Sequence, residues 1–337
     1  MIDLATTYMG LSLENPLVAS PSPLSYNLDG IRRLGEGGVG AIVLFSLFEE
    51  QLRDQAARAI RLVEDTAESF PEALGYFPDV AEEEGTPRAY LTLLERAAAS
   101  VDVPVIASLN GVTPEGWIEY ARSMQDAGAA AVELNIYYLP GEPGIAGREV
   151  EQRHVDVLEH VKSAVSVPVA VKLTPFFSSP GEMALRLDDA GADALVLFNR
   201  FLQPDIDPEQ LMVAPKVNLS SPADARLART WIALLRGKVR ASLAATSGVE
   251  VAADVARYLL AGADVVMTTS ALLRHGPGYA AELLDGLSAW MQRKGFQSVE
   301  DVRGLLAVPD DADAAAYERA GYVSAMRAAN AGAYDPW

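Results

Sequence analysis

Cysteine is absent from this chain of 337 residues. Its absence excludes disulfides, thiolate metal sites, cysteine-held iron–sulfur clusters and a cysteine nucleophile, and it suits a reducing cytosol. Positive charge is also scarce, with 27 Lys and Arg against 46 Asp and Glu and a formal net charge of -19. Because most of such a surface repels a polyanion, we do not expect nucleic acid as a partner.

Long apolar runs are missing as well. No stretch approaches the roughly 20 apolar residues that a bilayer-spanning helix needs. The first ten residues also lack the basic and then apolar pattern of a signal peptide. We therefore expect a soluble, cytoplasmic protein that does not associate with a membrane.

What the sequence does contain is a regular alternation of apolar runs and helical patterns. Hydrophobic residues make up 50% of the chain, enough for one large core. After a short hairpin at residues 3–13, continuous apolar runs alternate with helices, which predicts parallel strands covered on both faces. The predicted strands are residues 16–20, 41–46, 103–109, 130–137, 167–174, 194–199, 242–245 and 265–267.

This alternation predicts an α/β fold of the TIM (β/α)8 barrel type. A long segment between the second and third strands predicts an insertion there, and a C-terminal helical tail follows the last strand and helix. We expect residues 1–304 to form the barrel domain and residues 305–337 a helical extension.

Polar side chains gather where the predicted strands end. In a barrel of this type the carboxyl ends of the strands form one mouth, which holds the active site. In chain order these strand-end residues are Ala19 and Ser20, Ser46, Asn110, Asn135 with Tyr137 and Tyr138, Lys172 with Thr174, and Asn199 with Arg200.

Each of the last two strands is followed by a hydroxyl-rich turn. Thr246-Ser247-Gly248 follows the seventh strand, and Thr268-Thr269-Ser270 follows the eighth. In such a barrel these turns present backbone N–H groups to one point, which suits a phosphate. Either turn alone could simply cap its helix. Together, with Gly248 allowing close approach of the backbone, they favour a phosphate site.

Lys172 is the most informative strand-end residue because it ends an otherwise apolar strand. There it could stabilise the negative charge of a reduced flavin ring, or it could form a Schiff base. A lysine whose stem is buried and whose charge reaches solvent is the plain structural alternative. The amides of Asn110, Asn135 and Asn199 favour the flavin, since they suit the in-plane donors and acceptors of a heterocycle.

At these residues the sequence resembles the dihydroorotate dehydrogenase family of FMN-dependent barrel enzymes, over about residues 1–304. The resemblance implies that Ser247, Gly248, Thr269 and Ser270 hold the FMN phosphate. It further implies that the ring lies over Ala19 and Ser20 and meets Asn110, Lys172 and Asn199, with Ser46 also among the cofactor residues. The motifs that carry it are Asn15-Pro16, Glu133-Leu134-Asn135, Val171-Lys172-Leu173-Thr174-Pro175, Thr246-Ser247-Gly248-Val249 and Lys294-Gly295-Phe296.

Three departures from the family pattern concern the substrate side, and one of them is that the family's Asn-containing substrate loop has no counterpart near Ala73-Leu74-Gly75-Tyr76. In the soluble enzymes of the family, the fourth strand runs on as Asn-Leu-Ser-Cys-Pro-Asn, and the Cys is the base. Here the stretch is Asn135-Ile136-Tyr137-Tyr138-Leu139-Pro140, so Tyr138 holds the base position. The family's lysine on the second strand is replaced within Leu44-Phe45-Ser46. The flavin residues are therefore kept, whereas the substrate residues differ.

From these features we expect an FMN-dependent oxidoreductase acting on dihydroorotate or a related small cyclic compound, in pyrimidine biosynthesis. Lys172 would stabilise the reduced ring, Tyr138 (or Tyr137) would move the proton, and Asn135 with Asn199 would orient the substrate. The resemblance suggests a homodimer, and the electron acceptor would be soluble, either fumarate or a separate redox partner. Two alternatives stay open: a Schiff-base lyase using Lys172 on a phosphorylated substrate, and an FMN-binding barrel that has lost catalysis.

Overall fold

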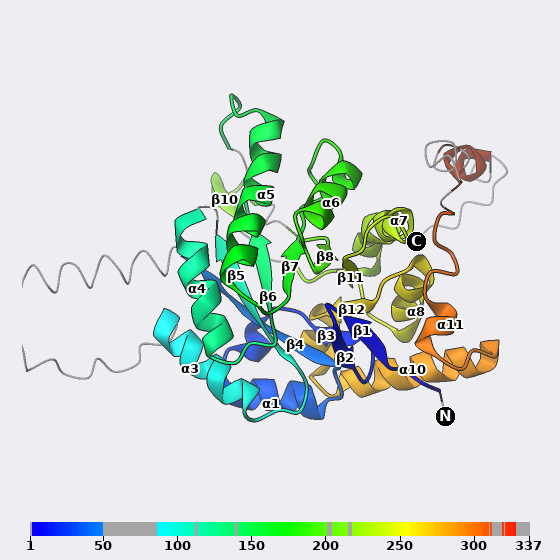
Figure 1. Ribbon diagram of the computed structural model, residues 1–337. Coiled ribbons are helices and arrows are strands. Elements are labelled where there is room, and N and C mark those ends of the chain that lie inside the picture. The colour runs from blue at the N-terminus through cyan, green and yellow to red at the C-terminus, as the bar shows by residue number, and fades with distance from the viewer. Residues whose placement is uncertain are drawn as a thin grey trace, which may run out of the picture.

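The fold is a closed barrel of parallel strands with helices around it (Figure 1). The computed structural model describes residues 2–49, 86–111, 114–138, 141–200, 204–214 and 218–309, together with 311, 319 and 321–327. The barrel strands are β3 (Leu17–Ala19), β4 (Ala41–Phe48), β5 (Val105–Gly111), β6 (Ala131–Ile136), β7 (Val169–Lys172), β8 (Ala194–Leu197), β11 (Ser242–Thr246) and β12 (Val265–Thr268). They pair in this order, with β12 closing on β3, which confirms the predicted TIM barrel and each predicted strand.

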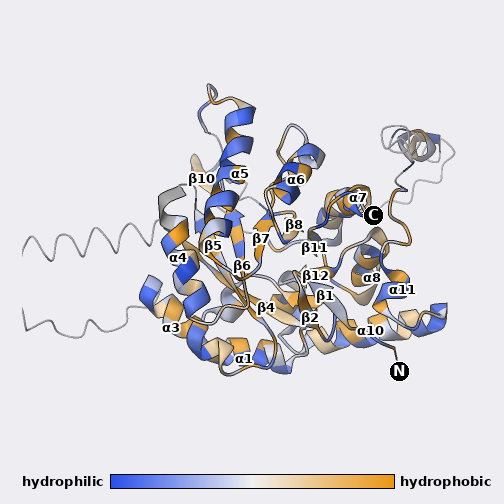
Figure 2. Ribbon diagram, in the orientation of Figure 1, coloured by the Kyte–Doolittle hydropathy of each residue, from blue (hydrophilic) through white to orange (hydrophobic). Residues whose placement is uncertain are grey.

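Helices cover the outside of the barrel and turn their apolar sides toward it (Figure 2). In α1, Ile31 and Leu34 are buried, whereas Arg32 and Arg33 between them are exposed, as a 3.6-residue period requires. The helices are α1 (Leu28–Glu36), α3 (Pro87–Ala98), α4 (Pro114–Asp126), α5 (Gly147–Ala164), α6 (Pro180–Asp189), α7 (Ala225–Leu235), α8 (Ala252–Ala261), α9 (Ser270–His275), α10 (Tyr279–Lys294) and α11 (Val299–Val302).

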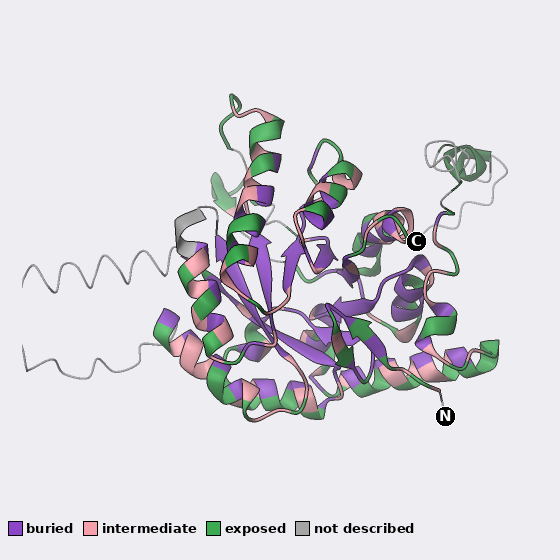
Figure 3. Cartoon of the chain, viewed as in Figure 1, coloured by how far each residue is buried: buried purple, intermediate pink, exposed green. Residues whose placement is uncertain are grey.

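The apolar strand residues form two layers, because successive side chains on a strand point to opposite faces. One layer faces into the barrel and includes Val18, Val196 and Met267. The other faces the helices and includes Leu17 and Leu134. Figure 3 shows the barrel strands buried along nearly their whole length, which is why each one is a continuous apolar run in the sequence.

The N-terminal hairpin closes the end of the barrel opposite the mouth. Its strands, β1 (Thr6–Tyr8) and β2 (Leu11–Leu13), pair antiparallel. Tyr8, Met9 and Leu13 are buried among the inward-facing residues. The backbone N–H of Met9 donates to Oγ of Ser242, at the first residue of β11, over 3.1 Å. The predicted hairpin is therefore confirmed, and it forms the floor of the barrel.

Three further segments complete the description. A second hairpin follows β8 and was not predicted; it consists of β9 (Asp205–Asp207) and β10 (Met212–Ala214), with Ile206 and Leu211 exposed. The predicted insertion after the second strand falls mainly on residues 50–85, outside the described residues. In the predicted C-terminal extension, residues 321–327 are helical. Nowhere in the described ranges is a helix long and apolar enough to cross a membrane.

Candidate active site

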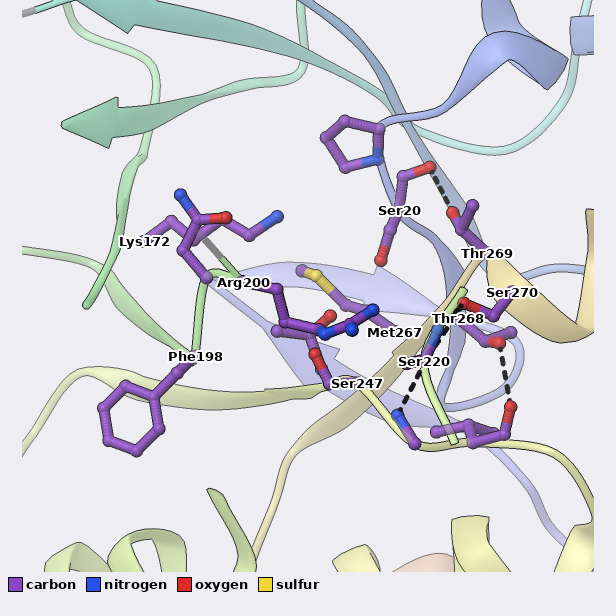
Figure 4. A pocket seen from close by; sticks show the side chains of 15 residues that line it. Ser20, Lys172, Phe198, Arg200, Ser220, Ser247, Met267, Thr268, Thr269 and Ser270 are labelled. Carbon is purple, nitrogen blue, oxygen red and sulfur yellow. Dashed lines mark hydrogen bonds between the residues drawn. The ribbon is translucent and has the colours of Figure 1, made fainter. Parts of the chain in front are cut away.

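A cavity opens at the carboxyl ends of the strands, between β3, β7, β8, β11 and β12. It contains about 520 Å³ free of protein atoms, part of which is open to solvent. Lys172 enters from β7, while hydroxyl groups from the loops after β3, β11 and β12 form the opposite wall (Figure 4). The sequence-predicted residues that line the cavity are Ser20, Lys172, Asn199, Ser247, Gly248, Thr269 and Ser270.

The two hydroxyl-rich turns meet in this cavity, and Ser220 connects them. Gly248 N–H donates to Ser220 Oγ over 3.1 Å. Ser220 in turn donates to Ser270 Oγ through its backbone N–H, over 3.0 Å, and through its hydroxyl, over 2.9 Å. Because Ser270 Oγ accepts both bonds, its own proton is left to donate to a ligand.

Ser220 was not among the predicted site residues. It lies in the loop before α7, where no strand or helix period fixes its position in advance. The available signal was the run Ser220-Ser221-Pro222 just ahead of a helix, which is typical of a turn that caps the helix with hydroxyls.

The backbone at Ser247 and Gly248 explains how the first turn reaches Ser220. Both residues have positive φ, 79° at Ser247 and 69° at Gly248. A Cβ on Gly248 would lie 2.7 Å from Ser221 O and 2.7 Å from Ala225 N, so only glycine lets the turn pack on the start of α7. The left-handed backbone of Ser247, a residue with a side chain, is costly and is typical of functional sites.

Thr269 joins the second turn to the end of β3. Its Oγ1 donates to the carbonyl oxygen of Ser20 over 2.9 Å. Ser20 Oγ is buried and has no hydrogen-bond partner among the described residues. A buried hydroxyl without a partner is uncommon in proteins, so Ser20 Oγ is suited to bond a ligand in the cavity.

Three of the predicted polar residues form a row across neighbouring strands. In the strand register, Asn110 of β5 lies opposite Asn135 of β6, and Asn135 lies opposite Lys172 of β7. Asn199, just after β8, donates from Nδ2 to Oδ1 of Asn135 over 2.6 Å. The structure thus brings these four side chains together, and the bond leaves the amide group of Asn135 and the carbonyl of Asn199 for a ligand.

Glu133 lies below this row and was missed by sequence reasoning. Its side chain is fully buried in β6, and Oε1 is 3.5 Å from Nζ of Lys172. Its other oxygen, Oε2, has no hydrogen-bond partner in the described part of the chain. Strand alternation could have identified Glu133 from the sequence, because Glu133 and Asn135 are two residues apart and so share the inward face of β6. Burial raises the pKa of Tyr8 in the barrel floor, and the negative charge of Glu133 raises it further.

Ser46 and Ala19 lie beside the cavity lining. Ser46 faces the barrel interior, where its Oγ is 2.8 Å from Oγ of Ser108, at the same level as Glu133. Ala19 is buried in β3 with its side chain in the layer that faces the helices. Its approach to a ligand would therefore be through its backbone.

Tyr138, the predicted acid/base residue, follows the end of β6. It does not line the cavity, and its ring packs against the layer that faces the helices. The guanidinium of Arg153, from α5, lies 4.1 Å from the centre of that ring. This is a cation–π contact, which holds the ring toward α5.

The chain is similar to dehydrogenases over most of its length. A sequence model of the dihydroorotate dehydrogenase family matches residues 3–291. The catalytic subunit of dihydroorotate dehydrogenase B (NAD(+)) from Methanothermobacter thermautotrophicus is 28% identical over 309 residues, which is 90% of this chain and 98% of that protein. The protein of the same name from Thermoplasma acidophilum is 26% identical to this chain, over 90% of this chain and 99% of the Thermoplasma protein. The NAD-dependent dihydropyrimidine dehydrogenase subunit PreA of Escherichia coli K12 is also 26% identical, over 90% of this chain and 76% of PreA.

Proposed function

This chain belongs to the dihydroorotate dehydrogenase family, and we propose that it is an FMN-dependent oxidoreductase acting on dihydroorotate or a related dihydropyrimidine. The observation that carries the proposal is the cavity, which brings most of the predicted cofactor residues together in one place. Two cations and several hydroxyls line it, and no Asp or Glu does so among the described residues. Such a lining suits an anionic ligand with a polar ring.

The residues present fit FMN. The unpartnered Ser20 Oγ offers a bond to the ring side of the cavity, and the free proton of Ser270 offers one to a phosphate oxygen. Ser247 and Thr269 would complete the phosphate site with Ser270, and Gly248 would let the backbone approach the phosphate closely. Ala19, Ser20, Ser46, Asn110, Lys172 and Asn199 would surround the ring. FMN, when bound, supplies the ring whose N5 exchanges hydride with the substrate.

The protein's own residues then have distinct roles. Lys172 would hold its ammonium against the N1/O2 edge of the ring, where negative charge develops on reduction. The ion pair with Glu133 fixes that ammonium from below. Asn135 and Asn199, bonded to each other, would present fixed amide groups that orient a planar substrate.

Tyr138 remains our proposed acid/base residue because it holds the position of the family's base. Its ring now packs beneath Arg153, so it would have to turn toward the mouth to reach a substrate. A substrate that closes the site could provide the free energy for that movement.

The electron acceptor and partners follow from the names of the relatives. Two of them are catalytic subunits named for NAD(+), and PreA is named as a subunit. We therefore propose that a separate soluble redox partner takes electrons from this chain, with fumarate as the alternative acceptor, and that the chain forms a homodimer in the cytoplasm. We propose that the chain acts in pyrimidine metabolism, and that the pathway is pyrimidine biosynthesis if the substrate is dihydroorotate.

A Schiff-base lyase is the second candidate, and one observation favours it. Such a mechanism needs a carboxylate near the lysine to move protons. Glu133 provides one, 3.5 Å from Lys172 Nζ. The opposing observation is the group of three amides, Asn110, Asn135 and Asn199, which a lyase would not require.

Purified protein separates these functions. We expect a yellow preparation that releases FMN on denaturation, and anaerobic addition of dihydroorotate or dihydrouracil should bleach the bound flavin. Comparing the two substrates identifies the class. Dihydroorotate carries a carboxylate that dihydrouracil lacks.

Two results would overturn the proposal. A colourless protein that fails to bind added FMN, but is inactivated by borohydride in the presence of a phosphorylated aldehyde or ketone, indicates the lyase. A yellow protein that no dihydropyrimidine bleaches indicates a barrel that binds FMN without catalysis.

A further inference from the structure

Arg200 brings a second positive charge to the cavity. It directly follows Asn199 at the end of β8, its side chain is exposed, and it lines the same cavity as Lys172. The protein as a whole carries a formal net charge of -19, so two cations and no described carboxylate in one lining form a local exception. This concentration of positive charge indicates that the cavity binds an anion.

The two cations differ in how they are paired. The ammonium of Lys172 has the buried carboxylate of Glu133 beneath it, 3.5 Å away. Among the described residues the guanidinium of Arg200 has no carboxylate partner, and it donates a hydrogen bond from Nη1 to the carbonyl oxygen of Asn218 over 2.9 Å. Arg200 therefore keeps both its charge and several N–H groups for a ligand.

The position of Arg200 relates it to the hydroxyl turns. Asn218 lies two residues before Ser220, so the loop that connects the two turns also orients the guanidinium. In Figure 4 the guanidinium extends from the β8 side toward Ser247 and Thr268. The guanidinium of Arg200 thus points toward the place where we expect the phosphate.

The turns themselves supply only neutral donors. The hydroxyl of Thr269 already donates to Ser20 O, and Gly248 N–H already donates to Ser220 Oγ. A phosphate monoester carries a charge of about -1.5 to -2 at pH 7 and is best matched by a forked guanidinium.

We propose that Arg200 is the charged ligand of the cofactor's phosphate. The inference rests on the proposed FMN function. Arg200 would then be the residue that lets the site distinguish FMN from riboflavin. Riboflavin has the same ring and side chain as FMN but no phosphate.

The test compares the two flavins on the full-length protein freed of cofactor. Affinities for FMN and riboflavin are measured by quenching of flavin fluorescence in the wild type, R200A, R200K and the control R32A. Arg32 is an exposed residue of α1, away from the cavity lining. Thermal unfolding of each variant establishes that it is folded.

We expect R200A to weaken FMN binding by about 30-fold, which corresponds to about 2 kcal/mol, and to leave riboflavin binding unchanged. R200K should lose less FMN affinity than R200A, because the lysine ammonium keeps the positive charge but not the forked N–H groups of the guanidinium. R32A should bind both flavins as the wild type does.

Three results would overturn the inference. Equal weakening of FMN and riboflavin by R200A would place Arg200 at the ring or in the fold. Unchanged FMN binding with a raised KM for dihydroorotate would assign Arg200 to the substrate carboxylate instead. Failure of the wild type to bind either flavin would remove the proposed function itself, a result distinct from the first two.

Discussion

The buried ion pair between Lys172 and Glu133 predicts that replacing Lys172 will weaken the fold as well as the chemistry. Methionine at position 172 would keep most of the apolar stem and remove the ammonium. Glu133 is fully buried, Lys172 is its one ion-pair partner among the described residues, and Oε2 has no partner there. In K172M a carboxylate would therefore be left inside the barrel without a counter-charge.

The size of the effect follows from burial and distance. Two unit charges 3.5 Å apart interact by about 5 kcal/mol at an effective dielectric constant of about 20. Removing one partner of a buried pair costs about 3–5 kcal/mol. For a chain of 337 residues the entropy of unfolding is about 0.7 kcal/mol per kelvin, so K172M should lower Tm by about 4–7 °C.

Thermal unfolding of the flavin-free proteins measures this effect, with two comparisons. K172M/E133Q removes both charges and should recover most of the loss. K162M breaks the pair of Lys162 with Asp193, which is shorter at 2.6 Å but 29% and 33% exposed, and it should cost about 1 kcal/mol or less.

The reasoning would be refuted if the double variant were as unstable as K172M, because the loss would then come from packing and not from charge. It would equally be refuted if K162M lost as much as K172M. If the prediction is correct, the catalytic role of Lys172 has to be measured in the double variant, where the fold is nearly intact.

Three other predictions concern separate features. G248A should lose several kcal/mol of stability and most FMN binding, since its Cβ would meet backbone atoms at 2.7 Å. The control G10A has a φ of 78° but no atom within 4 Å of a Cβ, so it should lose only about 1–2 kcal/mol of stability. Equal losses of the two variants in thermal unfolding would contradict this prediction. Burial lowers the pKa of His154, so the folded state holds it neutral while the unfolded chain takes up a proton below about pH 6.5. The free energy of unfolding of the wild type should therefore fall relative to that of H154Q between pH 7.5 and 5, as denaturant titrations can measure, and a constant difference would argue against it. Y138F should keep FMN binding and slow anaerobic flavin reduction by substrate at least about 100-fold, and wild-type rates would remove Tyr138 from the mechanism.

The fold was predictable because its signals are local and repeated. A strand covered on both faces must be apolar throughout, so β5, β6 and β7 are visible as continuous runs. The hydroxyl turns were predictable for the same reason, since turn chemistry follows strand ends within a few residues. The hairpin of β9 and β10 has neither a buried run nor a compact turn signal, and it was missed.

The site was less predictable, because it depends on contacts between distant segments. Ser220 connects the two turns from a loop whose position no period determines. Tyr138 lies beyond the last residue of β6, where strand alternation no longer determines which way a side chain points. Glu133, in contrast, shares the inward face with Asn135 and could have been found by applying alternation one step below the strand end.

The contrast between an acidic molecule and a mouth lined by cations has a kinetic consequence. At low ionic strength, where the Debye length is about 30 Å, an approaching phosphate meets the field of a molecule with a net charge of -19 well before it reaches the cavity, whereas at physiological ionic strength that field is screened beyond about 8 Å. Within the cavity it meets Lys172 and Arg200 at close range, where dissolved ions screen poorly. Moderate salt should therefore hasten the arrival of an anionic ligand, the opposite of the usual slowing in electrostatically steered association. The net negative charge of the molecule thus forms an electrostatic barrier to entry, and its height falls as counterions accumulate around the protein.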